Sequence, residues 1–173
     1  MNLAAVQPVE KNDQTVNVVI ETPSGSQYKY AFDQQLQLFK VKKILPLGSV
    51  FPFDFGFIPN TKGGDGDPLD VLVIADQKLF TGCLLSCRLL GMLEATQQEK
   101  DKVKLRNDRI IAVSESTTRY SDVKKISDLN KNMISELENF FIYYNKHDGK
   151  IFTPKKWVDA AAAMDMIIKS ILV

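Results

Sequence analysis

The sequence of 173 residues has few of the side chains that form zinc, redox or acid–base sites. It contains one histidine, His147, and two cysteines, Cys83 and Cys87. A Cys-x-x-Cys redox or zinc motif needs a spacing one residue shorter, together with further ligands. We therefore interpret both cysteines as small apolar residues on one face of a buried strand. His147 lies near the expected end of a helix, and we assign it no catalytic role.

The chain also lacks an excess of charge of either sign. It has 22 Lys and Arg against 21 Asp and Glu, for a net charge of +1. Binding to nucleic acid irrespective of its sequence requires a basic excess, so it is not expected here. No window approaches the ~18 consecutive apolar residues of a membrane span. The opening MNLAAVQPVEKND has neither the basic start nor the apolar stretch of a signal peptide, which favours a cytoplasmic protein.

The composition fits one folded domain over residues 1–173. The hydrophobic content of 45% is ordinary for a globular protein, and this length can bury a sizeable core. We find no internal repeat, low-complexity tract or linker.

The first two thirds of the chain have the pattern of a β-sheet. Short runs rich in Val, Ile and aromatics alternate with Gly, Pro, Asn and Asp. Lys29 is expected to share a strand face with Ala31, and Lys42 and Lys43 are expected on opposite faces. The most continuous apolar runs indicate strands buried on both faces. The expected strands are 16–22, 27–32, 36–45, 69–76 and 82–96, with a hairpin of 102–105 and 108–114 around Asn107.

The last third has helical periodicity. One helix is expected from an N-cap at Ser127 or Asp128 to Gly149, and a second from an N-cap at Thr153 with Pro154 in its first turn. Apolar residues three and four apart predict the inward face of each helix. The fold class is therefore α+β, a β-barrel or curved sheet with two helices packed against it. The inward faces are Leu129, Met133, Ile134, Leu137, Phe140, Phe141 and Tyr144, then Trp157, Ala161, Met164, Ile168 and Ile171.

Three carboxylates crowd the stretch GGDGDPLDVLVIAD, which contains Asp65, Asp67 and Asp70. Gly, Asp and Pro also make ordinary turns, so a plain turn is one interpretation. However, Asp70 adjoins an apolar run, where an unpaired carboxylate is costly. Like charges about 5 Å apart repel by on the order of 3 kcal/mol at an effective dielectric of 20. A divalent cation with oxygen ligands, such as Mg²⁺, Mn²⁺ or Ca²⁺, would relieve that repulsion.

The order of several short blocks resembles the family I soluble inorganic pyrophosphatases. The blocks are VVIE, YKY, FPFDFGFIPNT, DGDPLDVLV, IIAV and the FF-x2-Y of the first helix. The signature D-x-D-P-x-D is matched in full, and the resemblance spans roughly Val16 to Ile168. It implies an OB-like closed barrel of about five strands with two main C-terminal helices. It also implies Mg²⁺-dependent hydrolysis of pyrophosphate to two phosphates, and a homo-oligomer, commonly a hexamer in bacteria.

The resemblance also implies a role for individual residues. Asp67 is the expected base that helps to deprotonate the attacking water. Asp65, Asp70, Glu21 and, through its amide oxygen, Asn107 are the expected ligands of Mg²⁺ or Mn²⁺. The expected pyrophosphate- and phosphate-binding residues are Lys29, Lys43, Arg109 and Tyr144.

Several positions depart from the family pattern. Ala31, Gln97 and Asn107 stand where the pattern has acidic residues, so three negative charges are missing from a site that collects cations. Each lost charge should weaken metal binding. Glu99, Asp101 or Asp108 could replace these ligands from a long hairpin, or could face solvent. The other departures are Lys43 for arginine, Phe51 and Phe55 for tyrosines, Arg109 for lysine, and Asn145 for lysine.

Three functions remain open from the sequence. The first is a metal-dependent pyrophosphatase, favoured because Asp65, Asp67 and Asp70 are intact. The second is a degenerate relative that binds phosphate compounds or a partner without turnover. The third is an OB-like nucleic-acid binder whose FPFDFGF aromatics stack on bases. The near-zero net charge disfavours the third function, and these phenylalanines are expected in the core.

Overall fold

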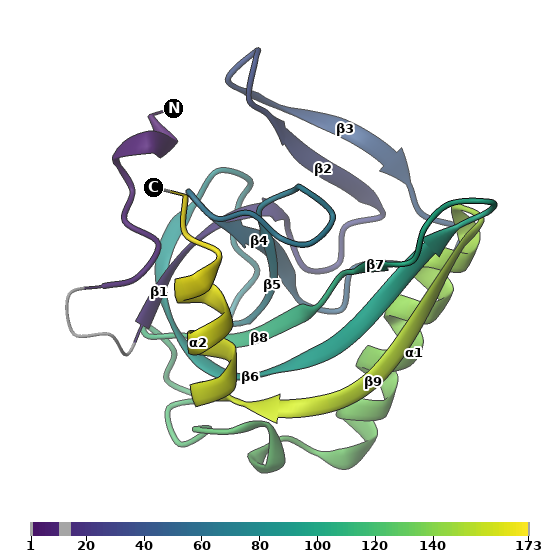
Figure 1. Cartoon of the computed structure of the whole chain (residues 1–173). Coiled ribbons are helices and arrows are strands. Elements are labelled where there is room, and N and C mark those ends of the chain that lie inside the picture. Colours follow the sequence, from purple (N-terminus) through teal and green to yellow (C-terminus); the bar gives the residue numbers. More distant parts are fainter. Residues whose placement is uncertain (1, 11–14, 173) are drawn as a thin grey trace.

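The computed structural model describes residues 2–10 and 15–172, and five of its strands form a closed barrel (Figure 1). The strand order β1-β4-β5-β8-β6 closes through pairing of β1 with β6, and the OB-like barrel expected from the sequence is confirmed. Strands β5 and β8 run parallel, whereas the other pairs of the ring are antiparallel. These strands are β1 (Thr15–Thr22), β4 (Asp54–Ile58), β5 (Leu69–Ile74), β6 (Leu84–Glu99) and β8 (Arg109–Ser114).

The remaining elements lie around this barrel. A separate two-stranded sheet stands beside it, and the second half of the long β6 carries two further strands. One helix precedes β9 and the other follows it. The elements are β2 (Tyr28–Asp33), β3 (Leu38–Ile44), β7 (Leu105–Arg106), β9 (Lys150–Asp159), α1 (Lys131–His147), α2 (Ala160–Lys169), and the 3-10 helices Leu3–Ala5 and Ile126–Asp128.

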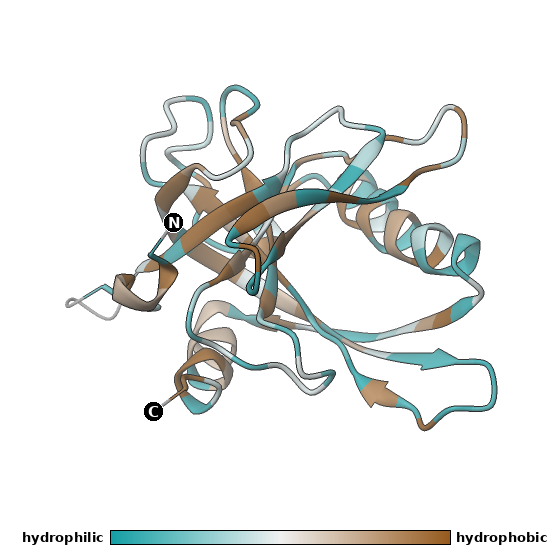
Figure 2. Ribbon diagram, turned by 90° about the horizontal axis from the view of Figure 1, so that it is seen from above, coloured by the Kyte–Doolittle hydropathy of each residue, from teal (hydrophilic) through white to brown (hydrophobic). Residues whose placement is uncertain are grey.

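The apolar strands are buried on both faces, as their continuous runs predict. In β5, Val71 packs in the core cluster that meets α2, and Leu72 packs in the cluster that meets α1. Figure 2 shows apolar residues concentrated on these central strands. Cys87 is fully buried and Cys83 half-buried against the first cluster, which confirms their interpretation as apolar core residues.

A close approach at Gly91 brings β9 against β6. A Cβ at this position would lie 2.3 Å from the carbonyl oxygen of Val158, and φ is +153°. The register of β6 against β8 shifts between Leu89 and Gly91. Only glycine fits such a conformation and contact, so this residue permits β9 to take over from β1 on one edge of β6, while the other edge stays paired with β8 as far as Leu93.

The expected helix from Thr153 is wrong, because residues 150–159 form strand β9. This strand pairs with β6 from Glu99 to Gly91, and Pro154 sits where that register shifts. A bulge tolerates proline, which cannot donate to a ladder. Helix α2 begins after Asp159, whose Oδ1 accepts a hydrogen bond of 2.9 Å from Ala162 N. Its buried residues are Ala163 and Ile167, rather than the expected Ala161 and Ile168.

Three smaller expectations are also corrected. Helix α1 is capped by Asn130, whose side chain accepts from Asn132 N, and not by Ser127 or Asp128. The expected hairpin around Asn107 does not form, because β7 and β8 both pair with β6. Strand β4 arises from FPFDFGF, which is not among the strands expected from the sequence. As expected, its aromatics belong to the core, with Phe51, Phe55 and Phe57 buried.

Candidate functional site

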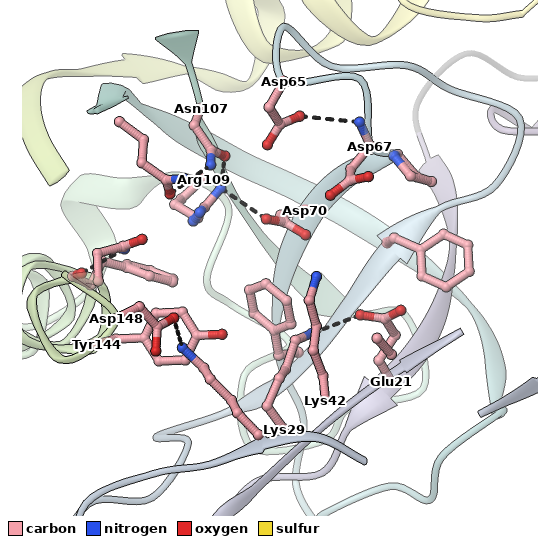
Figure 3. A pocket seen from close by; sticks show the side chains of 18 of the residues that line it. Glu21, Lys29, Lys42, Asp65, Asp67, Asp70, Asn107, Arg109, Tyr144 and Asp148 are labelled. Atoms are coloured by element: carbon pink, nitrogen blue, oxygen red, sulfur yellow. Dashed lines mark hydrogen bonds and ion pairs between the residues drawn. The ribbon is translucent and has the colours of Figure 1, made fainter. Parts of the chain in front are cut away.

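One cavity of about 380 Å³ brings together all nine residues that the sequence singled out (Figure 3). Its lining comes from β1, the β2–β3 hairpin, the loop before β5, and the segment that joins β7 to β8. The C-terminal end of α1 completes the lining. The nine residues are Glu21, Lys29, Lys43, Asp65, Asp67, Asp70, Asn107, Arg109 and Tyr144.

The acidic loop between β4 and β5 is held in shape by its own backbone. Gly63 N donates to Asp67 O at 2.7 Å, and Gly66, with φ +91°, donates to Gly63 O at 3.1 Å. Thr61 Oγ1 accepts from Leu69 N at 3.1 Å where the loop enters β5. Asp65 and Asp67 therefore sit on a tight turn, and Asp70 follows inside the strand.

The electrostatics of the loop favour a cation. Partial burial raises the pKa of Asp65 above its ordinary value, and the charges of Asp70 and Asp67 raise it further. Hydrogen bonding to Asp67 N and the charge of Arg109 only partly oppose this rise in pKa. The oxygen donors and their mutual repulsion fit Mg²⁺ or Mn²⁺. Within residues 2–10 and 15–172, no three Asp, Glu, His or Cys side chains converge into a metal site by themselves.

Opposite the loop, Lys29 and Glu21 form a buried ion pair. Lys29 Nζ lies 2.7 Å from Glu21 Oε2, and the two side chains are 7% and 11% exposed. Glu21 Oε1 also accepts from Phe32 N at 2.8 Å. The ammonium lies 4.1 Å from the centre of the Phe55 ring, a cation–π contact. Both oxygens of Glu21 thus already have protein partners.

A second lysine is fixed at the end of α1. Lys43 pairs with Asp148, and its Nζ lies 3.4 Å from the centre of the Tyr144 ring. Burial lowers the pKa of Lys43, and the nearby charges of Lys150 and Lys29 add to this effect, whereas Asp148 opposes it. Burial raises the pKa of Tyr144, so its hydroxyl stays protonated and can donate a hydrogen bond.

Asn107 and Arg109 connect the acidic loop to β6. Arg109 Nη1 lies 2.9 Å from Asp70 Oδ2 and also donates to Asn107 Oδ1. Asn107 Nδ2 donates to Gln97 Oε1 at 3.0 Å. Figure 3 shows Asn107 and Arg109 beside Asp70 and the acidic loop.

The chain is similar in sequence to known inorganic pyrophosphatases over almost its whole length. The family model described as "Inorganic pyrophosphatase" matches residues 18–172. The inorganic pyrophosphatase of Synechocystis is 36% identical over 167 residues, which cover 96% of this chain and 95% of that protein. The inorganic pyrophosphatase of Saccharolobus solfataricus is 35% identical over 153 residues, which cover 87% of this chain and 83% of that protein. The chain belongs to the inorganic pyrophosphatase family.

Solved structures from the family have the same fold. The Thermus thermophilus inorganic pyrophosphatase superposes with a TM-score of 0.88 at 31% identity, over 98% of this chain and 97% of that one. The Neisseria gonorrhoeae protein gives 0.87 at 28% identity, over 98% and 96%. This chain therefore has the barrel-and-helix architecture that the motifs implied, and solved inorganic pyrophosphatases share it.

Seven of the eight departures from the pyrophosphatase pattern line the same cavity, namely Ala31, Lys43, Phe55, Gln97, Asn107, Arg109 and Asn145. Asn145 is buried, and its Nδ2 donates to Phe141 O, so it interacts within its own helix. The departures thus lie within the pocket itself and alter its charge.

The three carboxylates that could have replaced the missing ligands do not line this cavity. Glu99 pairs with Lys102 and Lys150, and these contacts lower the pKa of Glu99 to about 2. Asp108 pairs with Arg106 and accepts from Ala95 N. Asp101 lies exposed in the turn after β6.

The cavity also contains residues that sequence reasoning missed. A bulge in β3 opposite Lys29 and Tyr30 places Lys42 in the lining together with Lys43, so the expectation of opposite faces is wrong here. Asp148 and Lys150 flank the turn from α1 into β9, and the sequence did not single them out. No local sequence signal distinguishes them from solvated charges.

Proposed function

We propose that this protein hydrolyses inorganic pyrophosphate to two phosphates with the help of divalent cations. The observation that carries the proposal is the convergence of Asp65, Asp67 and Asp70 with lysines and an arginine on one cavity. Figure 3 places the carboxylates across the cavity from the lysines. Such a pocket suits a polyanion that arrives with cations, because each sign of charge finds a partner.

In this proposal, Asp67 is the base that takes a proton from the attacking water. Its side chain is exposed on the loop, and among the described residues no hydrogen bond or ion pair engages its carboxylate. The neighbouring carboxylates have other roles, because Asp70 is paired with Arg109. No covalent nucleophile is required, since water attacks directly.

We propose Mg²⁺ as the cofactor, with Mn²⁺ as an alternative, held by Asp65 and Asp70 and assisted by Glu21 and Asn107. When bound, such an ion polarises phosphoryl oxygens and lowers the pKa of a bound water. Glu21 would have to share its carboxylate with Lys29. Water and phosphate oxygens would complete the coordination shell, because the protein supplies too few converging ligands.

The substrate-binding residues in this proposal are Lys29, Lys43, Arg109 and Tyr144. The cations neutralise phosphate oxygens, and the Tyr144 hydroxyl donates a hydrogen bond. Lys43 is a point charge and lacks the bidentate geometry of an arginine. We therefore expect this chain to hold phosphate with less directional contacts there.

The proposal extends to the setting of the protein. We infer a homo-oligomer, a hexamer by resemblance, located in the cytoplasm. Its partners are pyrophosphate and phosphate, without nucleic acid or membrane. In the part of the chain that is described, no helix is long and apolar enough to cross a membrane.

The deciding assay is phosphate release from pyrophosphate with excess Mg²⁺, then Mn²⁺. We expect turnover in the native protein and a loss of at least about 100-fold in Asp67→Asn, since general base catalysis contributes 10²–10⁴-fold. The matched control is Asp101→Asn, which removes the same charge from an exposed turn. Absent turnover, or equal turnover in the native protein and Asp67→Asn, would contradict the proposal and favour the non-hydrolysing alternative.

A further inference from the structure

A nearly buried arginine stands inside the acidic wall of the cavity. The Arg109 side chain is 5% exposed, and its Nη1 contacts Asp70 Oδ2 at 2.9 Å, Asp108 O at 2.8 Å and Asn107 Oδ1. A carboxylate, an amide oxygen and a carbonyl oxygen thus converge on one guanidinium nitrogen. A small cation would attract the same three kinds of oxygen.

Two neutral amides fix the arrangement. A guanidinium only donates hydrogen bonds, so Asn107 must present its oxygen to Arg109. Its Nδ2 then donates a hydrogen bond of 3.0 Å to Gln97 Oε1. Asn107 N donates to Ala95 O at 3.0 Å and anchors the segment to β6. The two amides therefore require a cationic hydrogen-bond donor at this point. They hold the Arg109 guanidinium next to Asp70.

Aromatic packing keeps the guanidinium in place. Its Cζ lies 5.3 Å from the centre of the Phe141 ring and 5.4 Å from that of Phe152. A move toward solvent would give up both cation–π contacts and leave Asp70 without its partner. Burying an arginine is favourable only with such compensation. The arginine is thus built into the wall of the site.

We propose that Arg109 is a resident cation that takes the place of one divalent ion between Asp70 and Asn107. The remaining divalent ions then lie on the side of Asp65 and share Asp70 and Asn107 with Arg109. The neutral Gln97 and Asn107 belong to this design, because Gln97 accepts from the Asn107 amide group, which in turn presents its oxygen to Arg109. The inference rests on the proposed metal dependence of the site, but it concerns binding and not turnover.

The test counts Mn²⁺ ions bound per chain, with no pyrophosphate present, from the electron paramagnetic resonance signal of free Mn²⁺. We expect Arg109→Gln to bind one more ion than the native protein. The control is Arg106→Gln, which removes the same charge from a 54% exposed side chain that pairs with Glu94 and Asp108. It should match the native count. Equal counts for the native protein and Arg109→Gln would overturn the proposal.

A second variant keeps the arginine and therefore the packing. Asn107→Asp is nearly isosteric, and Gln97 can rotate its amide to donate to the new carboxylate. If Arg109 is the resident cation, it pairs with this carboxylate, and the Mn²⁺ count stays at the native value. The double variant with Arg109→Gln should then gain an ion. An extra ion in Asn107→Asp alone would overturn the proposal, even if Arg109→Gln fails to fold.

The outcomes separate this inference from the proposed function. Phosphate release is measured on the native protein independently of the ion counts. Native protein without turnover, together with an extra ion in Arg109→Gln, contradicts the hydrolase and supports the resident cation. Turnover by the native protein, together with equal ion counts in the native protein and Arg109→Gln, supports the hydrolase and contradicts the resident cation.

Discussion

At the scale of single residues, the ion pair of Lys29 and Glu21 affects both the stability of the fold and the position of a lysine charge in the cavity. Both side chains are almost fully buried, and each is the main charge partner of the other. Removing one partner of a buried pair leaves an uncompensated charge, which costs about 3–5 kcal/mol. The pair therefore holds a lysine at the cavity only as long as the carboxylate remains beside it.

We predict that Lys29→Met lowers the free energy of unfolding by about 3–5 kcal/mol, because Glu21 stays buried without its partner. The double variant Lys29→Met with Glu21→Gln should recover most of that loss. Urea unfolding of both variants and of Glu21→Gln completes the cycle. Strictly additive losses would show that the two side chains are not coupled.

Asp54 shows how a buried carboxyl links stability to pH. Burial raises the pKa of its carboxyl, although Ser24 N and Leu79 N donate hydrogen bonds that oppose the rise. Because the pKa of Asp54 is higher in the folded state than in the unfolded state, the protonated carboxyl contributes to the free energy of unfolding at a pH below the unfolded-state pKa. That contribution is lost as the pH rises through the folded-state pKa.

We therefore predict that the native protein loses stability relative to Asp54→Asn as the pH rises from below the ordinary aspartate value of 3.8 to above it. Altered hydrogen bonds in the variant add an offset that does not depend on pH, so the change with pH is the measured quantity. Thermal melts across this range test it. A difference that is independent of pH would contradict the raised pKa.

At the scale of elements, the segment 150–159 shows how a partner decides secondary structure. Thr153 and Pro154 are good residues for a helix start, and the sequence after them has helical spacing. The second half of β6 nevertheless offers an unpaired edge, and nine residue pairs form there. Ladder hydrogen bonds with a distant strand override local preference. No feature within this segment reveals that edge.

The displaced start of α2 yields a prediction at this scale. Asp159→Ala removes the side chain that caps Ala162 N and should lower the free energy of unfolding by about 1 kcal/mol. Asp165→Ala, exposed within the same helix, is the matched control and should change little. Equal effects in chemical denaturation would place the cap elsewhere.

At the scale of the whole molecule, the proposed cation couples the loop to global stability. Ions that bind only the folded state stabilise it by RT ln(1 + [L]/Kd), about 2.7 kcal/mol at one hundred times Kd. We predict that saturating Mg²⁺ raises the melting temperature of the native protein. The rise should vanish in Asp65→Asn with Asp70→Asn.

Asp101→Asn again serves as the control for lost charge in this experiment, and it should keep the full rise. Differential scanning calorimetry with and without Mg²⁺ gives the shift directly. A rise of the same size in the variant that lacks Asp65 and Asp70 would place the stabilising ion outside the acidic loop.

The sequence by itself determined the acidic motif and the buried strands, and its resemblance to the pyrophosphatase family indicated nine of the residues that line the cavity. These depend on spacing and composition within short segments: GDGDP makes a tight turn, and continuous apolar runs must be buried. The tertiary structure alone decided that Arg109 meets Asp70, that Asp148 meets Lys43, and that residues 150–159 form a strand. Each of these outcomes depends on residues distant in the chain or on a bulge that shifts the strand register by one residue. Local propensity carries no information about distant partners or about such a register shift.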